Sequence, residues 1–160
     1  MNLLEIIAFA VIIVVILIVA YILKGNSSEK EKEVNEEVKV LINQIVSEIE
    51  NFKPSRGYHD EFPYKIELIG YLKSKFPNAD IEQQKGSSRP DIVVNDVAIE
   101  LKGPTRTEQL KTIADKCMRY YQHFKGLIIV LFEVEVNEPR YEEWKQGIKN
   151  TFPNVRIIRK

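Results

Sequence analysis

The stretch DIVVNDVAIELK, residues 91–102, places two short runs rich in Val and Ile on either side of Asn95-Asp96. β-Branched residues favour strands, and an Asn-Asp pair between two strands is typical of a tight hairpin turn. The sequence therefore predicts an antiparallel hairpin with strands over residues 92–94 and 97–101. With Asn95 and Asp96 in the turn, the opposed pairs are Val94 with Val97, Val93 with Ala98, Ile92 with Ile99, and Asp91 with Glu100.

The two faces of this hairpin differ in chemistry, because side chains alternate sides along a strand. One face is purely aliphatic. The opposite face carries Asp91, Glu100 and Lys102 at the open end of the hairpin. Opposed side chains have Cβ atoms about 5 Å apart, and like charges at that distance repel. We therefore expect a cation close to Asp91 and Glu100. The aliphatic face, predicted to lie in the core, consists of Ile92, Val94, Val97, Ile99 and Leu101.

Two cations are candidates for that position. A divalent metal such as Mg²⁺ or Mn²⁺ would use both carboxylates and keep several waters, and Lys102 would neutralise part of the charge. A metal and a lysine together make a hydrolytic site. The metal polarises a phosphodiester and activates a bound water, and the lysine orients that water or stabilises developing negative charge. The alternative is a solvated strand face that bears Asp, Glu and Lys without further function.

A mixed sheet with flanking helices is predicted around the hairpin. Apolar spacing and the Pro- and Gly-containing breaks divide this part of the chain into alternating elements. The order is helix, three strands, helix, strand, helix, strand, which places the chain in the α/β class (α+β, mixed sheet). The helices are predicted over residues 62–76, 105–124 and 139–151, and the remaining strands over residues 79–84, 127–136 and 155–158.

The run Arg89-Pro90-Asp91, followed after eight residues by Glu100-Leu101-Lys102, resembles the PD-(D/E)XK motif of the restriction-endonuclease-like nuclease superfamily. The resemblance covers residues 62–136 and implies an αβββαβ core, followed here by a C-terminal αβ extension. It implies that Asp91 and Glu100 bind Mg²⁺ or Mn²⁺ and that Lys102 is the catalytic lysine.

Many members of this superfamily add an acidic residue from the first helix of the core. Glu67 is the best match for this third metal ligand, and Glu61 is a weaker alternative. Some relatives also carry a Gln and a Tyr four residues apart on the helix after the motif. Here Ile113 stands four residues after Gln109, so this sub-motif is absent and the substrate subclass stays open.

Composition limits the function classes. The chain carries 23 basic and 23 acidic side chains, which excludes a strongly basic nucleic-acid coat protein. Residues 53–160 have nineteen Lys and Arg against fifteen Asp and Glu, a mild excess that permits a polyanionic partner. Arg89, Arg106 and Arg119 are weak candidates for contacts with nucleic acid. The single Cys and the two His exclude a disulfide scaffold and argue against a zinc site.

An apolar segment stands at the start of the chain. Residues 6–23 are eighteen consecutive uncharged residues, and Leu3 and Leu4 extend the run, so we predict a transmembrane helix over residues 3–23. A cleaved signal peptide is disfavoured, because no Lys or Arg precedes the segment. The lysines that follow it predict a single-pass protein of the cell membrane with its C-terminal domain in the cytoplasm.

A charged helical stalk is predicted over residues 24–53, because apolar residues recur at three- and four-residue spacing from Val34 to Phe52. This stripe would either pair with a second copy of the chain or pack on the domain that follows. The nuclease-like domain is predicted over residues 54–160.

Taken together, these patterns predict a membrane-anchored, metal-dependent nuclease that hydrolyses phosphodiesters in DNA. The expected partners are the membrane, DNA and a second copy of the chain, bound through the stalk or the domain. The alternative is a catalytically inactive module that keeps the nuclease fold and tethers a binding partner to the membrane.

Overall fold

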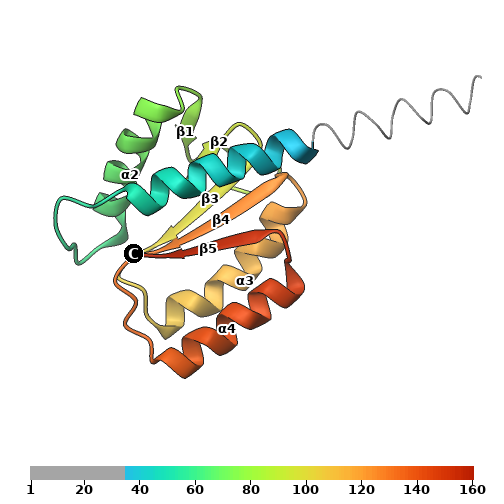
Figure 1. Ribbon diagram of the computed structural model, residues 1–160. Coiled ribbons are helices and arrows are strands. Elements are labelled where there is room, and N and C mark those ends of the chain that lie inside the picture. The colour runs from blue at the N-terminus through green and yellow to red at the C-terminus, as the bar shows by residue number, and fades with distance from the viewer. Residues whose placement is uncertain (1–34) are drawn as a thin grey trace, which may run out of the picture. The chain divides into compact units, whose positions relative to one another are not determined.

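A five-stranded mixed sheet in the order β1-β2-β3-β4-β5 forms the centre of the fold (Figure 1). The computed structural model describes residues 35–160. β1, β2 and β3 are antiparallel neighbours, whereas β3, β4 and β5 run parallel. This confirms the predicted α/β class with a mixed sheet. The strands are β1 (Ala79–Ile81), β2 (Ile92–Val94), β3 (Val97–Lys102), β4 (Gly126–Leu131) and β5 (Val155–Arg159).

The predicted hairpin is present in the predicted register. Val94 pairs with Val97, Val93 with Ala98 and Ile92 with Ile99. Asn95 has a φ of 52°, in the left-handed region that Asn tolerates better than most residues. The two-residue Asn95-Asp96 turn therefore sets the register of the hairpin locally.

Helices alternate with the strands in the predicted order. From α2 to β5, the order is helix, three strands, helix, strand, helix and strand. Two predicted strands are too long: β1 ends at Ile81 and β4 at Leu131, because Glu82 and Glu133 have positive φ values of 50° and 46° that end the extended backbone. The helices are α2 (Glu61–Lys75), α3 (Thr107–Tyr121), α4 (Glu138–Thr151) and a helix described over residues 35–51.

The sheet is covered on both faces, so it separates two apolar cores. The aliphatic face of the hairpin packs with α2 and with the 35–51 helix, where Tyr64, Leu68 and Ile45 are fully buried. The opposite face packs with α3 and α4, through residues such as Ile113 and Ile148. Figure 1 shows the same arrangement, with α3 and α4 together on one side of the strands. Parallel strands in an α/β fold are normally covered in this way.

The compact unit begins at Val38, before the predicted boundary between residues 53 and 54. Ile45 and Ile49 are fully buried in the same core as the hairpin. Gly126 at the start of β4 leaves room for Ile42, since a Cβ at this position would lie 2.6 Å from the Ile42 Cδ1. Of the two uses predicted for the apolar stripe, the structure shows packing on the domain.

The predicted transmembrane helix over residues 3–23 and the first part of the predicted stalk lie outside the described residues. Within residues 35–160, no helix combines the length and the apolar character that a membrane crossing requires. The membrane anchor therefore stays a prediction from the sequence.

Cys117 offers an internal probe of this fold, because it is the only cysteine of the chain. It is 1% exposed in the core between α3 and the sheet. Burial, with the negative charge of Glu100 adding to it, raises the pKa of the Cys117 thiol to about 12. We expect no reaction with a thiol-specific reagent at a pH of about 8.5, where an ordinary thiol is half ionised. If Cys117 reacted with the reagent as fast in the folded full chain as in the denatured chain, this packing would be wrong.

Candidate active site

Asp91, Glu100 and Lys102 lie together at the open end of the β2–β3 hairpin. Asp91 immediately precedes β2, and the other two belong to β3. They are only 8%, 1% and 7% exposed, respectively, although all three are charged residue types. The Leu101 N–H donates to the Asp91 Oδ2 at 2.9 Å, which holds the aspartate against the neighbouring strand. The structure therefore brings the three predicted catalytic residues into one buried cluster.

The Glu100 carboxylate is the centre of this cluster. The Nζ of Lys102 lies 3.0 Å from its Oε1, and the Lys116 ammonium contacts the same oxygen. The Tyr120 hydroxyl donates to the Oε2 at 2.9 Å. Burial raises the pKa of the Glu100 carboxyl and the charge of Asp91 raises it further, while the two ammonium groups oppose the shift only in part. Asp91 and Glu100 are thus close enough to interact electrostatically.

Lys102 is held between two carboxylates. Its Nζ lies 2.9 Å from the Glu61 Oε2 as well as 3.0 Å from the Glu100 Oε1. Burial alone would lower the pKa of the Lys102 ammonium, but Glu100 and Glu61 outweigh that effect and raise it above its usual value. The lysine is therefore a fixed positive charge in the cluster.

A third lysine of the cluster, Lys65, approaches Asp91 from α2. The Lys65 Nζ lies 3.4 Å from the Asp91 Oδ1 and 2.9 Å from the Glu82 Oε1. Burial would lower the pKa of Lys65, but its hydrogen bond to Glu82 and the charge of Asp91 raise it overall. Glu82 also pairs with Arg89 and has the positive φ noted above. Backbone strain of this kind is common at functional sites.

Glu61, and not Glu67, is the acidic residue that α2 contributes to the cluster. The Glu67 carboxylate accepts hydrogen bonds from the Ser55 N–H at 2.8 Å, from the Ser55 hydroxyl and from the Tyr58 hydroxyl. These bonds lower the pKa of Glu67. Six residues correspond to about 600° around a helix, so residues 61 and 67 face different directions. The structure thus does not bring the predicted third ligand, Glu67, to Asp91 and Glu100.

The three arginines predicted to contact nucleic acid each pair with an acid. Arg89 pairs with Glu82, and Arg106 pairs with Glu135 at 2.8 Å. Arg119 pairs with Asp115 on its own helix at 2.9 Å. All three side chains are at least 45% exposed. Exposed pairs of this kind contribute little to stability and exchange readily, so the arginines are accessible to a polyanion without being built into the cluster.

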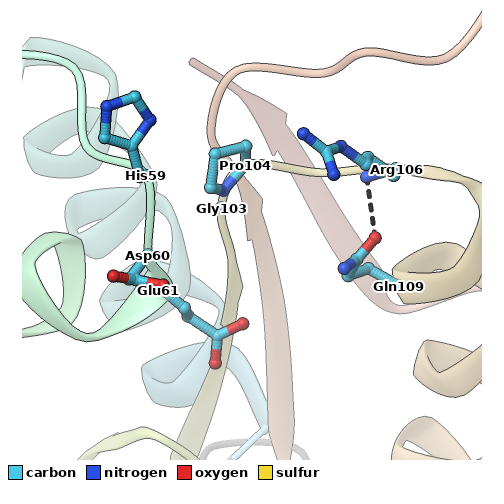
Figure 2. A pocket seen from close by; sticks show the side chains of 7 residues that line it. All are labelled: His59, Asp60, Glu61, Gly103, Pro104, Arg106 and Gln109. Carbon is cyan, nitrogen blue, oxygen red and sulfur yellow. Dashed lines mark hydrogen bonds between the residues drawn. The ribbon is translucent and has the colours of Figure 1, made fainter.

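An open pocket adjoins the Lys102–Glu61 pair. In Figure 2, His59, Asp60 and Glu61 lie on one side of Gly103-Pro104, and Arg106 and Gln109 lie on the other. The Arg106 N–H donates to the Gln109 Oε1 at 2.9 Å, which fixes the start of α3 beside the pocket. Glu61 both lines the pocket and binds Lys102, so the pocket lies beside the cluster, although Asp91, Glu100 and Lys102 do not line it themselves. The pocket lining consists of His59, Asp60, Glu61, Gly103, Pro104, Arg106 and Gln109.

The carboxylates of this cluster suit a divalent cation that keeps several water ligands better than one bound by protein side chains alone. Among residues 35–160, no group of three His, Cys, Asp or Glu side chains is placed to hold a metal ion. Mg²⁺, however, is normally bound through one or two carboxylates and keeps several waters. Asp91 and Glu100 supply two such carboxylates, and the two ammonium groups on one oxygen of Glu100 mark a position that attracts cations.

Lys116 and Tyr120 are site residues that the sequence pattern does not single out. They stand four residues apart on α3, so they share one face of the helix. This spacing is the only local feature of the sequence that points to the pair. Their contacts with Glu100 join residues at least sixteen positions apart and depend on how α3 packs against β3.

Comparison with known proteins gives no further guide to the site. The chain matches no protein-family model, no curated protein and no solved structure. The function must therefore be inferred from the residues and their geometry.

Proposed function

We propose that this chain is a membrane-anchored, metal-dependent nuclease with the restriction-endonuclease-like fold. The observation that carries the proposal is the buried cluster of Asp91, Glu100 and Lys102. It lies on the hairpin of a helix–three strands–helix–strand core, which is the element order that the resemblance implies. DNA is the proposed substrate, and Mg²⁺ or Mn²⁺ the proposed cofactor.

The burial of these charges supports a functional role over the alternative of a solvated strand face. Removing a charged side chain from water is costly even when it is paired. Glu100, at 1% exposed, lies beside the second carboxylate of Asp91, which makes its ionised form less favourable still. Arrangements of this kind, with shifted pKa values and specific charge partners, concentrate at active sites.

Each residue of the cluster has a distinct role in the proposed reaction. Asp91 and Glu100 would hold the cation. When bound, the cation would lower the pKa of a coordinated water and polarise the scissile phosphodiester. Lys102, held as an ammonium between Glu61 and Glu100, would stabilise the negative charge that develops on the phosphate. Glu61 is then a positioning residue, because it orients Lys102.

A second candidate function is a catalytically inactive nuclease-fold module that tethers a partner. The observation that favours it is the pairing of every carboxylate in the cluster with a lysine: Lys65 with Asp91, Lys102 with Glu61, and Lys116 with Glu100. In such a module the lysines would replace the metal permanently, and no divalent cation would bind.

Cleavage assays on the full chain, purified in detergent micelles, separate the two functions. The substrates are duplex, single-stranded and branched DNA, each with Mg²⁺, with Mn²⁺ and with a chelator. We expect cleavage that requires the metal, with one DNA structure preferred. Absence of cleavage of every substrate in both metals would favour the inactive module.

The two glutamates of α2 provide a matched pair of variants. Glu61→Gln removes the charge that orients Lys102, and we expect the cleavage rate to fall by about 10- to 100-fold, as for other residues that position a catalytic group. Glu67→Gln should leave the rate unchanged, because Glu67 contacts Ser55 and Tyr58 instead. Equal losses in the two variants would contradict the assignment of Glu61.

The proposed location follows from the sequence outside the described residues. We retain the single transmembrane span over residues 3–23 and a cytoplasmic domain as part of the proposal, on the strength of the apolar run and the lysines after it. Association of two copies, through residues 24–53 or through residues 54–160, belongs to the same proposal.

A further inference from the structure

Lys116 occupies an unusual position for a helix surface lysine. Its ammonium contacts the Oε1 of Glu100, the same oxygen that the Lys102 Nζ approaches to 3.0 Å. The other oxygen of Glu100 accepts the hydrogen bond of Tyr120. Both lone-pair positions of the Glu100 Oε1 are therefore occupied by ammonium groups, and a metal ion can bind this oxygen only if one of the two lysines moves away.

The two lysines on Glu100 are not equally held. Lys102 has a second carboxylate, Glu61, and its side chain is 9% exposed. Among the described residues, Glu100 is the only ion-pair partner of Lys116, whose side chain is 27% exposed. A cation arriving at Glu100 would therefore displace the Lys116 ammonium more easily than that of Lys102. A displaced lysine at the rim of a nuclease site is in turn available to a phosphate group.

We infer that Lys116 exchanges with the metal: it occupies the cation position at Glu100 in the metal-free protein and becomes a contact for a substrate phosphate when the metal binds. This inference rests on the proposed function, because it requires that a divalent cation binds at Glu100. It makes Lys116 a substrate-binding residue that couples metal binding to the binding of nucleic acid. Metal-free protein would bind DNA weakly, since the lysine would still be paired with Glu100.

The inference predicts opposite effects of one substitution on two affinities. Lys116→Met removes the competitor of the metal, so the affinity for Mn²⁺ should rise by about tenfold, the change that corresponds to losing one modest ion pair. The same variant should bind DNA more weakly once the metal is present, because it lacks a phosphate contact. A lysine that merely stabilised the fold would not produce these opposite changes.

Metal affinity is measured by titration calorimetry of the full chain with Mn²⁺ alone. Lys111→Met is the matched control, because Lys111 lies on the same helix, is exposed and makes no ion pair among residues 35–160. We expect tighter Mn²⁺ binding in Lys116→Met and in Lys116→Gln, and wild-type binding in Lys111→Met. Lys116→Gln keeps a polar side chain, so tighter binding in both variants would not be caused by a folding defect that only Met introduces.

DNA affinity is measured with Ca²⁺ in place of Mg²⁺, over a range of salt concentrations. The slope of the logarithm of the DNA-binding constant against the logarithm of the salt concentration should be smaller by about one in Lys116→Met, because one phosphate contact is lost. Without a divalent cation, Lys116→Met and wild type should bind alike.

The outcomes separate this inference from the proposed function. If wild type binds Mn²⁺ and cleaves DNA but Lys116→Met binds Mn²⁺ no more tightly, the exchange is wrong and the nuclease assignment stands. If wild type binds no divalent cation, both are wrong.

Discussion

Replacing Lys102 by Met should reduce the rate of metal-dependent DNA cleavage by at least about a hundredfold, a typical loss when one group that stabilises transition-state charge is removed. The fold should survive, because Glu61 is partly exposed and Glu100 keeps its contacts with Lys116 and Tyr120. The measurement is single-turnover cleavage of the preferred DNA substrate by the full chain in detergent, at saturating Mg²⁺.

Two further variants show whether this loss has the proposed cause. Lys111→Met should cleave at the wild-type rate. Glu100→Gln should lose both cleavage and metal binding, whereas Lys102→Met should lose cleavage and retain a metal-dependent rise in melting temperature. Cleavage by Lys102→Met within a few-fold of wild type would remove Lys102 from the chemistry and leave the cluster without its proposed function.

Replacing Ile49 by Ala should lower the free energy of unfolding by about 2–5 kcal/mol, the usual cost of truncating a large buried aliphatic side chain. Ile49 is fully buried in the core shared by the 35–51 helix, α2 and the hairpin. Denaturant unfolding followed through Trp144, the only tryptophan, reports this stability. The Trp144 Nε1–H donates to the Leu110 carbonyl at 3.0 Å, so its fluorescence monitors the packing of α4 on α3.

Val40→Ala is the control for that experiment, because Val40 lies on the same helix and is 55% exposed. Its effect should stay within about 0.5 kcal/mol, as for other surface substitutions. If Ile49→Ala were as harmless as Val40→Ala, residues 38–51 would be a stalk independent of the domain.

The hairpin was predictable because its determinants are local. The Asn95-Asp96 turn specifies the register, and the alternation of side-chain direction along each strand then assigns Asp91, Glu100 and Lys102 to one face. The clustering of Asp91, Glu100 and Lys102 follows from that register alone, since the three residues lie on one face of two paired strands.

Contacts set by tertiary packing were not predictable in the same way. The apolar stripe from Val34 to Phe52 has the same spacing in the sequence whether the helix packs on a sheet or on a second copy of the chain. Glu61 and Glu67 are equally plausible on a helix until the position of α2 shows which one reaches Lys102. The contact of Lys116 with Glu100 likewise depends on where α3 lies against β3.

The proposed nuclease activity requires that Asp91 and Glu100 share one divalent cation, and a metal titration of the melting temperature tests this claim. A ligand that binds only the folded state stabilises it by about 2.7 kcal/mol at a concentration of 100 times its Kd. We predict that Mn²⁺ raises the melting temperature of the full chain saturably in wild type and does not raise it in Asp91→Asn or Glu100→Gln. A wild-type melting temperature that does not respond to Mn²⁺ or Mg²⁺, or an equal response in all three proteins, would contradict the claim.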